Sequence, residues 1–112
     1  MKLPNRGQAF IPPAKIFDYL LSATHRVGKS KARFFTLLGF DLDSASALVE
    51  ELLALAQSGE VDEEIPTQFG QKYVLDGTIA TPNGKRVTIR TVWIIENGQD
   101  TPRFVTAHPL SK

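Results

Sequence analysis

A histidine and several basic residues lie close together between positions 24 and 33. His25 and two lysines, Lys29 and Lys31, fall within seven residues of one another, in a segment that contains no acid. Imidazole titrates near neutral pH, so His25 is a candidate general acid or base. The lysine ammonium groups are suited to phosphate oxygens. A lone loop histidine is more often a surface or capping residue, and taken alone His25 favours that interpretation.

The same segment leads into a predicted helix. Ser30 is a good N-cap residue, and Lys31 and Arg33 would then lie in the first turns, where they oppose the helix dipole. An anion bound at the helix N-terminus would offset that cost. The acidic stretch that follows Gly59 could offset it as well. The pattern is therefore compatible with a phosphate site or with internal pairing.

Charge is distributed unevenly along the chain. Residues 1–40 carry +6, residues 41–64 carry −8, and the rest carries +3, although the net charge is only +1. A basic block raises the local potential and speeds the approach of polyanions such as nucleic acid. The alternative is that acidic residues fold over the basic block and neutralise it. The acids in question are Glu60, Asp62, Glu63 and Glu64.

Apolar spacing predicts an α+β fold with about three N-terminal helices packed on a C-terminal antiparallel meander of about four strands. Helical spacing covers residues 12–22, which open with Pro12 and Pro13. It also covers residues 30–38 before Gly39 and residues 44–58 before Gly59. From Glu60 onward the period changes to two. Strands are expected at residues 61–65, 72–80, 86–96 and 103–108.

A turn between the second and third strands fixes their register. Residues 81–85 read Thr-Pro-Asn-Gly-Lys, which predicts a three-residue loop with a glycine in the left-handed position. Apolar side chains then mostly face apolar partners across the two strands. The expected pairs are Ile79 with Val87, Leu75 with Thr91, Tyr73 with Trp93, and Val74 with Val92.

The same register pairs Asp76 with Arg90 in an otherwise apolar strand, where an unpaired charge would be costly. The two form either a structural cross-strand ion pair or an arginine that Asp76 orients toward a substrate phosphate. His108 lies in the last expected strand. It faces Arg90 if the loop after Glu96 has an odd number of residues, and lies on the other face if that number is even.

Composition narrows the class of protein. The chain has 112 residues, which is an ordinary length for a single domain, expected here to span residues 1–112. It has no cysteine, so disulfides, thiolate zinc sites and cysteine nucleophiles are excluded. The two histidines lack the spacing of a zinc motif, and no metal or other cofactor is expected. No stretch is apolar enough to span a membrane, so a cytoplasmic protein is expected.

A set of short motifs is spread over nearly the whole chain. They are Leu3-Pro4-Asn5, Ile11-Pro12-Pro13, Lys15, Tyr19-Leu20-Leu21, His25, Val27 through Phe35, Leu38-Gly39-Phe40, Lys72-Tyr73-Val74, Asp76-Gly77, Pro82-Asn83-Gly84, Arg90 through Ile94, and Thr106-Ala107. Together these motifs resemble an uncharacterised family of small bacterial domains. That family is similar to C-terminal domains of polymorphic and phage-head-associated toxins, and its order of elements resembles the barnase–EndoU–colicin–RelE group of metal-independent ribonucleases.

The resemblance implies RNA cleavage by attack of a ribose 2′-hydroxyl on the adjacent phosphate. His25 and His108 would be base and acid in either order, although many family members are expected to carry tyrosine at the position of His108. Lys29, Lys31 and Arg90 would bind the phosphate and stabilise the transition state, and Thr106 would position it. The implied partners are RNA, transfer RNA among the candidates, and a cognate antitoxin or immunity protein. The alternative is a non-catalytic accessory domain whose basic face docks an acidic protein or nucleic acid.

Overall fold

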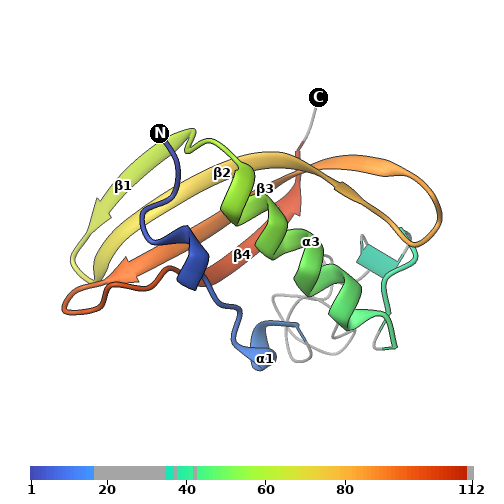
Figure 1. Cartoon of the computed structure of the whole chain (residues 1–112), viewed down its shortest axis with the longest axis horizontal. Coiled ribbons are helices and arrows are strands. Elements are labelled where there is room, and N and C mark those ends of the chain that lie inside the picture. Colours follow the sequence, from blue (N-terminus) through green and yellow to red (C-terminus); the bar gives the residue numbers. More distant parts are fainter. Residues whose placement is uncertain (17–34, 37, 42, 111–112) are drawn as a thin grey trace.

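In the part of the chain that the structure describes, a four-stranded antiparallel sheet has one long helix lying across one of its faces (Figure 1). The computed structural model describes residues 1–16, 35–36, 38–41 and 43–110. The strands follow one another in chain order across the sheet, so the sheet is a meander. In chain order the elements are η1 (Arg6–Gln8), α1 (Pro13–Lys15), α3 (Ala45–Ser58), β1 (Glu63–Thr67), β2 (Gly70–Ala80), β3 (Arg86–Glu96) and β4 (Arg103–Pro109).

The β2–β3 hairpin is the longest pairing in the sheet, and its predicted register is confirmed. The backbone N–H of Thr81 donates to the Lys85 carbonyl at 2.8 Å, and Gly84 takes a φ of +82°. A residue other than glycine would be strained at that φ. The pairing continues from this turn along the whole of both strands, and Tyr73 lies opposite Trp93 as the sequence predicts.

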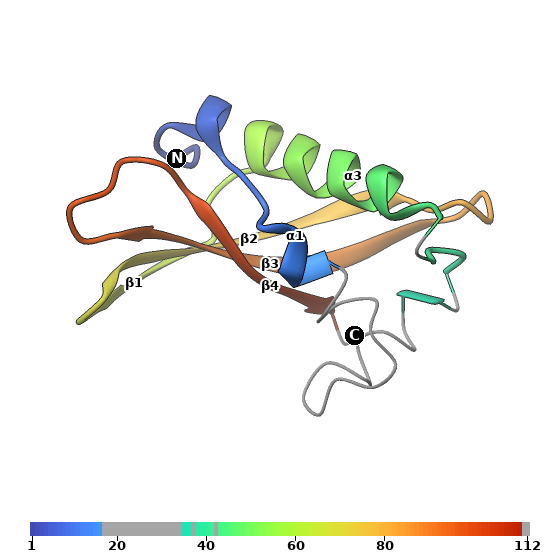
Figure 2. The same ribbon diagram turned by 90° about the horizontal axis from the view of Figure 1, so that it is seen from below.

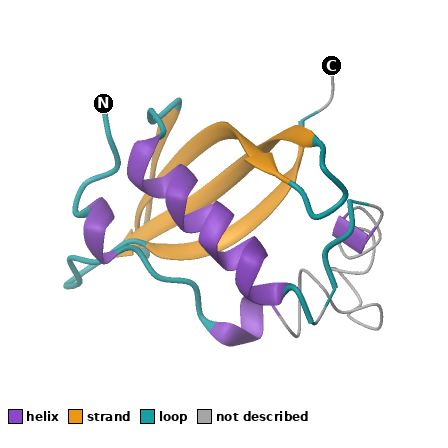
Figure 3. Cartoon of the chain, turned by 45° about the vertical axis from the view of Figure 1, so that its right-hand side comes forward, coloured by secondary structure: helices purple, strands orange, loops and turns teal. Residues whose placement is uncertain are grey.

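Helix α3 packs its apolar stripe on the sheet, over β2 (Figure 3). Leu48, Leu52 and Leu55 are buried on this stripe. Gly77 in β2 permits the close approach, because a Cβ atom there would lie 2.8 Å from Leu55 Cγ. No helix in the described part of the chain is long and apolar enough to cross a membrane.

The N-terminal residues pair with later parts of the chain at two points. Lys2 forms an antiparallel bridge with Glu60, and Phe10 forms a parallel bridge with Arg103. The N-terminal ammonium and the Lys2 ammonium both lie 3.1 Å from the Glu60 carboxylate. The start of the chain is thereby tied to the segment between α3 and β1.

This tie is expected to make stability depend on pH. Hydrogen bonds from the N-terminal ammonium and from Lys2 lower the pKa of Glu60 below its ordinary value of 4.5. A lowered pKa in the folded state stabilises the fold above the unfolded pKa, and the contribution is lost as pH falls through the folded pKa. Glu60→Gln should therefore lower the urea midpoint at pH 7, and the difference from wild type should vanish in acid.

Urea titrations of both proteins from pH 7 down to pH values below 4.5 would measure this change. Glu50→Gln, at an exposed position on α3, is the matched control. A difference between Glu60→Gln and wild type that persisted unchanged into acid would show that the ion pair is not its source. Because these groups are exposed, added salt should also reduce the difference.

The predicted arrangement of about three N-terminal helices packed on a C-terminal meander is wrong. Within the described residues one main helix, α3, lies in the middle of the chain, and only Pro13–Lys15 of the predicted first helix is helical there. Residues 17–22 and most of the predicted second helix lie outside the described residues. Apolar spacing over about ten residues is a weak basis for a helix, since helices of that length are marginal without tertiary packing.

Candidate functional site

A row of three polar residues crosses the face of the sheet that points away from α3. Asp76 on β2 pairs with Arg90 on β3, and Arg90 pairs with His108 on β4. Directly opposed residues in an antiparallel sheet lie on the same face, with Cα atoms about 4.5–5.5 Å apart. In the described part of the chain no helix lies over this face (Figure 2). The row therefore brings a carboxylate, a guanidinium and an imidazole together.

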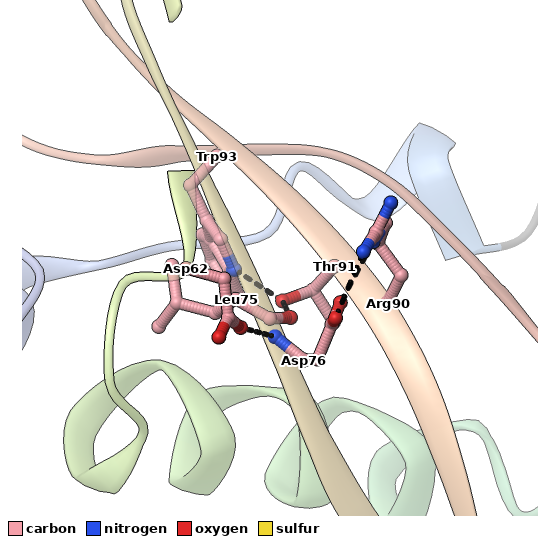
Figure 4. Close-up of polar contacts among 6 residues, drawn as sticks. All are labelled: Asp62, Leu75, Asp76, Arg90, Thr91 and Trp93. Atoms are coloured by element: carbon pink, nitrogen blue, oxygen red, sulfur yellow. Dashed lines mark hydrogen bonds and ion pairs between the residues drawn. The ribbon is translucent and has the colours of Figure 1, made fainter. Parts of the chain in front are cut away.

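Asp76 holds Arg90 by a two-point ion pair (Figure 4). Arg90 Nε donates to Asp76 Oδ1 at 2.8 Å, and Nη2 donates to Oδ2 at 2.9 Å. This fork-to-fork geometry fixes the plane of the guanidinium. Two of the five guanidinium N–H groups are occupied, and the Arg90 side chain is 40% exposed. The structural ion pair predicted from the sequence is present, and the partly exposed guanidinium has three further N–H groups outside this ion pair.

Acidic groups around Arg90 stabilise its positively charged form. The hydrogen bonds that Arg90 donates to Asp76, and then the charge of Asp76, raise the pKa of Arg90 above its ordinary value, and the charges of Glu63 and Asp62 act in the same direction. Arg90 therefore remains a cation at any physiological pH. The same acids also reduce the net positive potential that an approaching phosphate meets.

An irregularity between β3 and β4 brings His108 beside Arg90. Near the hairpin loop Ile94 pairs with Arg103 and Trp93 with Phe104, the register of an even-numbered loop. The register then shifts between Val92 and Trp93, so that Val92 pairs with Thr106. An extra residue in one strand moves the side chains beyond it to the opposite face. The predicted facing of Arg90 and His108 is therefore observed, but a bulge produces it instead of an odd-numbered loop.

Thr106 belongs to the same face. It lies two residues before His108 on β4, and side chains two residues apart in a strand share a face. Its partner Val92 lies two residues after Arg90 on β3. Thr106 and His108 are both partly buried, and each makes interactions within the protein. The structure thus brings Arg90, Thr106 and His108 together on one face.

Two linked hydrogen bonds lie on the core face of the sheet, beneath the row. Thr91 Oγ1 donates to the Leu75 carbonyl at 2.8 Å, and Trp93 Nε1 donates to Thr91 Oγ1 at 3.0 Å (Figure 4). Thr91 and Trp93 are fully buried. Leu75 is next to Asp76 in sequence, and Thr91 is next to Arg90. The hydrogen bond from Thr91 to Leu75 therefore links β3 to β2 at the row.

Three of the predicted site residues are not described by the structure. His25, Lys29 and Lys31 lie outside the described residues. Within the acidic stretch, Glu60 pairs with Lys2, a member of the N-terminal basic block. The described residues contain no group of three or more His, Asp or Glu side chains that could hold a metal ion.

A family model described as Domain of unknown function (DUF6883) matches residues 2–111. The chain belongs to this family. The predicted resemblance to an uncharacterised family of small domains agrees with that match. Neither the family description nor the match names a ribonuclease, so the more distant resemblance to that group of enzymes stays a prediction.

The fold is shared with a chain from a contact-dependent growth inhibition toxin–immunity protein complex of Klebsiella pneumoniae 342. The TM-score is 0.73, and the likeness covers 96% of this chain and 97% of that chain. Sequence identity is 19%, so the likeness establishes a common fold and nothing finer. No curated protein matches the chain in sequence.

Sequence reasoning missed Asp62 as a member of the site. Its carboxylate oxygen Oδ2 accepts the backbone N–H of Asp76 at 2.7 Å. From sequence, Asp62 is one of four acids in a run of five residues, and nothing in that run marks it out. Its role follows from the register of β1 on β2, and no distinctive turn signal like that of residues 81–85 reveals that register.

Proposed function

We propose that this chain is a metal-independent ribonuclease of bacterial toxin type, acting as one domain on RNA in the cytoplasm. The observation that supports it is the row of Asp76, Arg90 and His108, which sets a fixed cation beside a group able to transfer a proton. Such a pair meets two of the needs of phosphodiester cleavage. The fold shared with a chain of a bacterial toxin–immunity protein complex supports the toxin part of the proposal.

In the proposed reaction a base removes the proton of the ribose 2′-hydroxyl, whose oxygen attacks the adjacent phosphorus. The bond from phosphorus to the 5′-oxygen breaks, and an acid protonates that oxygen, leaving a 2′,3′-cyclic phosphate and a 5′-hydroxyl. His25 and His108 supply the base and the acid. Arg90, Lys29 and Lys31 stabilise the charge that builds on the phosphate oxygens, where oriented cations are most effective. Thr106 positions the phosphate by a hydrogen bond.

A domain of this kind would be lethal to its own producer without an inhibitor. We therefore extend the proposal to a cognate antitoxin or immunity protein, as in the complex that contains the structural neighbour. The direct sign would be poor expression in bacteria, relieved by substitution of the site. Free accumulation of the wild-type domain at high yield would count against a toxin.

His108→Ala is expected to slow RNA cleavage by about 10²–10⁴-fold, the usual contribution of a general acid or base. The measurement is the cleavage rate of total bacterial RNA and of transfer RNA in the presence of a chelator. Thr88→Ala, at an exposed position on β3 one row from Arg90, is the matched control and should cleave as wild type does.

Intact RNA with the wild-type protein would sink the ribonuclease proposal for these substrates. Equal cleavage by wild type and His108→Ala would remove His108 from the mechanism. A His25→Ala, Lys29→Ala double variant tests the other half of the proposed site in the same assay. Its thermal stability must match that of wild type for the comparison to hold.

A second candidate function is a non-catalytic domain that docks an acidic protein or nucleic acid. The engagement of Arg90 with Asp76 favours it over catalysis, because the ion pair occupies two of the guanidinium N–H groups that a substrate phosphate would use. Binding by a basic surface should then weaken gradually as single cations are removed and as salt rises. In that case RNA would be retained on the protein but not cut.

A further inference from the structure

Asp62, the residue just before β1, accepts a hydrogen bond that lies outside the backbone ladder of the sheet. The ladder between β1 and β2 begins with Glu63 opposite Val74, and Asp76 lies two residues beyond it on β2. The Asp62 backbone N–H donates to the Val74 carbonyl at 2.8 Å. The Asp62 carboxylate oxygen Oδ2 accepts from the Asp76 N–H at 2.7 Å. One residue thus extends the edge pairing through its side chain.

This contact lies one step from the guanidinium. The Asp76 N–H points toward Asp62 and away from β3, so the backbones of Asp76 and Arg90 form a non-hydrogen-bonded cross-strand pair. Opposed side chains approach most closely in pairs of this kind. The Asp76 side chain then holds Arg90 at two points. A shift of the Asp76 backbone would move the carboxylate and rotate the guanidinium with it.

We propose that Asp62 is a positioning residue for the site. Its carboxylate fixes the backbone of Asp76, and through Asp76 it fixes the direction in which Arg90 presents its remaining N–H groups. Its consequence for cleavage rests on the proposed ribonuclease function, whereas its effect on the orientation of Arg90 does not. The role depends on an acceptor at this position and not on negative charge as such.

Three variants separate position from charge. Asp62→Ala removes the acceptor and the charge, while Asp62→Asn removes the charge and keeps a carbonyl acceptor. Glu63→Gln removes a neighbouring charge that also acts on Arg90 but leaves the Asp62 contact in place. Both positions are exposed, so the variants should fold.

The first readout is nuclear magnetic resonance of the free protein. In Asp62→Ala the Asp76 amide should exchange with solvent about 10-fold faster, as expected on loss of one hydrogen bond, and the Arg90 Nε–H signal should shift and broaden. Asp62→Asn and Glu63→Gln should keep the wild-type Arg90 signal. An unchanged Arg90 signal in Asp62→Ala would overturn the proposal, and so would equal changes in all three variants.

The second readout is single-turnover cleavage of RNA with the RNA affinity measured alongside. Asp62→Ala should slow cleavage by about 10- to 100-fold, the cost of misplacing a group by a fraction of an ångström to an ångström, with little change in affinity. Asp62→Asn should restore most of the rate. A wild-type protein that cleaves no RNA would end the proposed function, while the Arg90 and Asp76 signals would still decide the positioning role.

Discussion

Arg90→Lys is expected to lower the rate of RNA cleavage by about 100- to 1,000-fold, the loss found when one preorganised donor to a developing oxyanion is removed. Lysine keeps the positive charge but loses the planar fork that Asp76 grips at two points. Its ammonium would be held by one contact, without a fixed direction. Arg90→Lys is therefore predicted to lose most of the cleavage rate although it keeps the positive charge.

The chain contains a matched control for this substitution. Arg103 lies on the same face, and its Nε donates to Glu96 Oε1 at 2.8 Å, the same length as the contact from Arg90 Nε to Asp76. Arg103→Lys should leave single-turnover cleavage close to wild type, because Arg103 lies outside the row of Asp76, Arg90 and His108. Equal rates for Arg90→Lys and wild type would show that no oriented guanidinium is needed.

The pairing of Asp76 with Arg90 could be predicted because a local signal controls it. Residues 81–85 define a turn with a particular loop length, and everything along β2 and β3 follows from that turn by counting. Such reasoning works when the turn residues impose a backbone conformation, as Gly84 does. It gives side-chain partners without any knowledge of the rest of the fold.

The facing of Arg90 and His108 depended on information that is not local. Counting from the loop gave two alternatives, and the bulge beside Trp93 and Phe104 makes both inapplicable in their simple form. These two rings pack edge to face in the core, with their centroids 5.3 Å apart. Keeping both rings inside while His108 points to the other face requires one extra residue in β4, and only the three-dimensional packing reveals that requirement.

The predicted number and place of the helices were wrong, although the helix expected over residues 44–58 is present as α3. Apolar burial near the N-terminus does not need a helix: Leu3 is buried in a non-helical segment, next to Lys2, which bridges Glu60. Burial alone does not identify the type of element, because an extended segment paired along a sheet also hides alternate side chains. The contact that positions the Asp76 backbone likewise comes from Asp62, which no periodic pattern distinguishes from its acidic neighbours.

Thr91→Val is expected to lower the free energy of unfolding by about 1–3 kcal/mol, the cost of leaving a buried donor without a partner. Valine has nearly the shape of threonine but no hydroxyl, so the Trp93 Nε1–H would lose its acceptor and the Leu75 carbonyl would lose a donor. Both side chains are fully buried, so solvent has no access to replace the lost hydrogen bonds. Urea unfolding measures the change.

Trp93 is the single tryptophan of the chain, so its indole N–H gives a site-specific signal for the same prediction. In Thr91→Val this proton should exchange with solvent faster than in wild type, whereas Thr91→Ser keeps the hydroxyl and should keep the protection. Because Thr91 and Leu75 adjoin Arg90 and Asp76, the Arg90 Nε–H signal should broaden in the valine variant alone. If the valine and serine variants had equal stability and equal indole protection, the hydroxyl would not be the link that holds the two strands beneath the site.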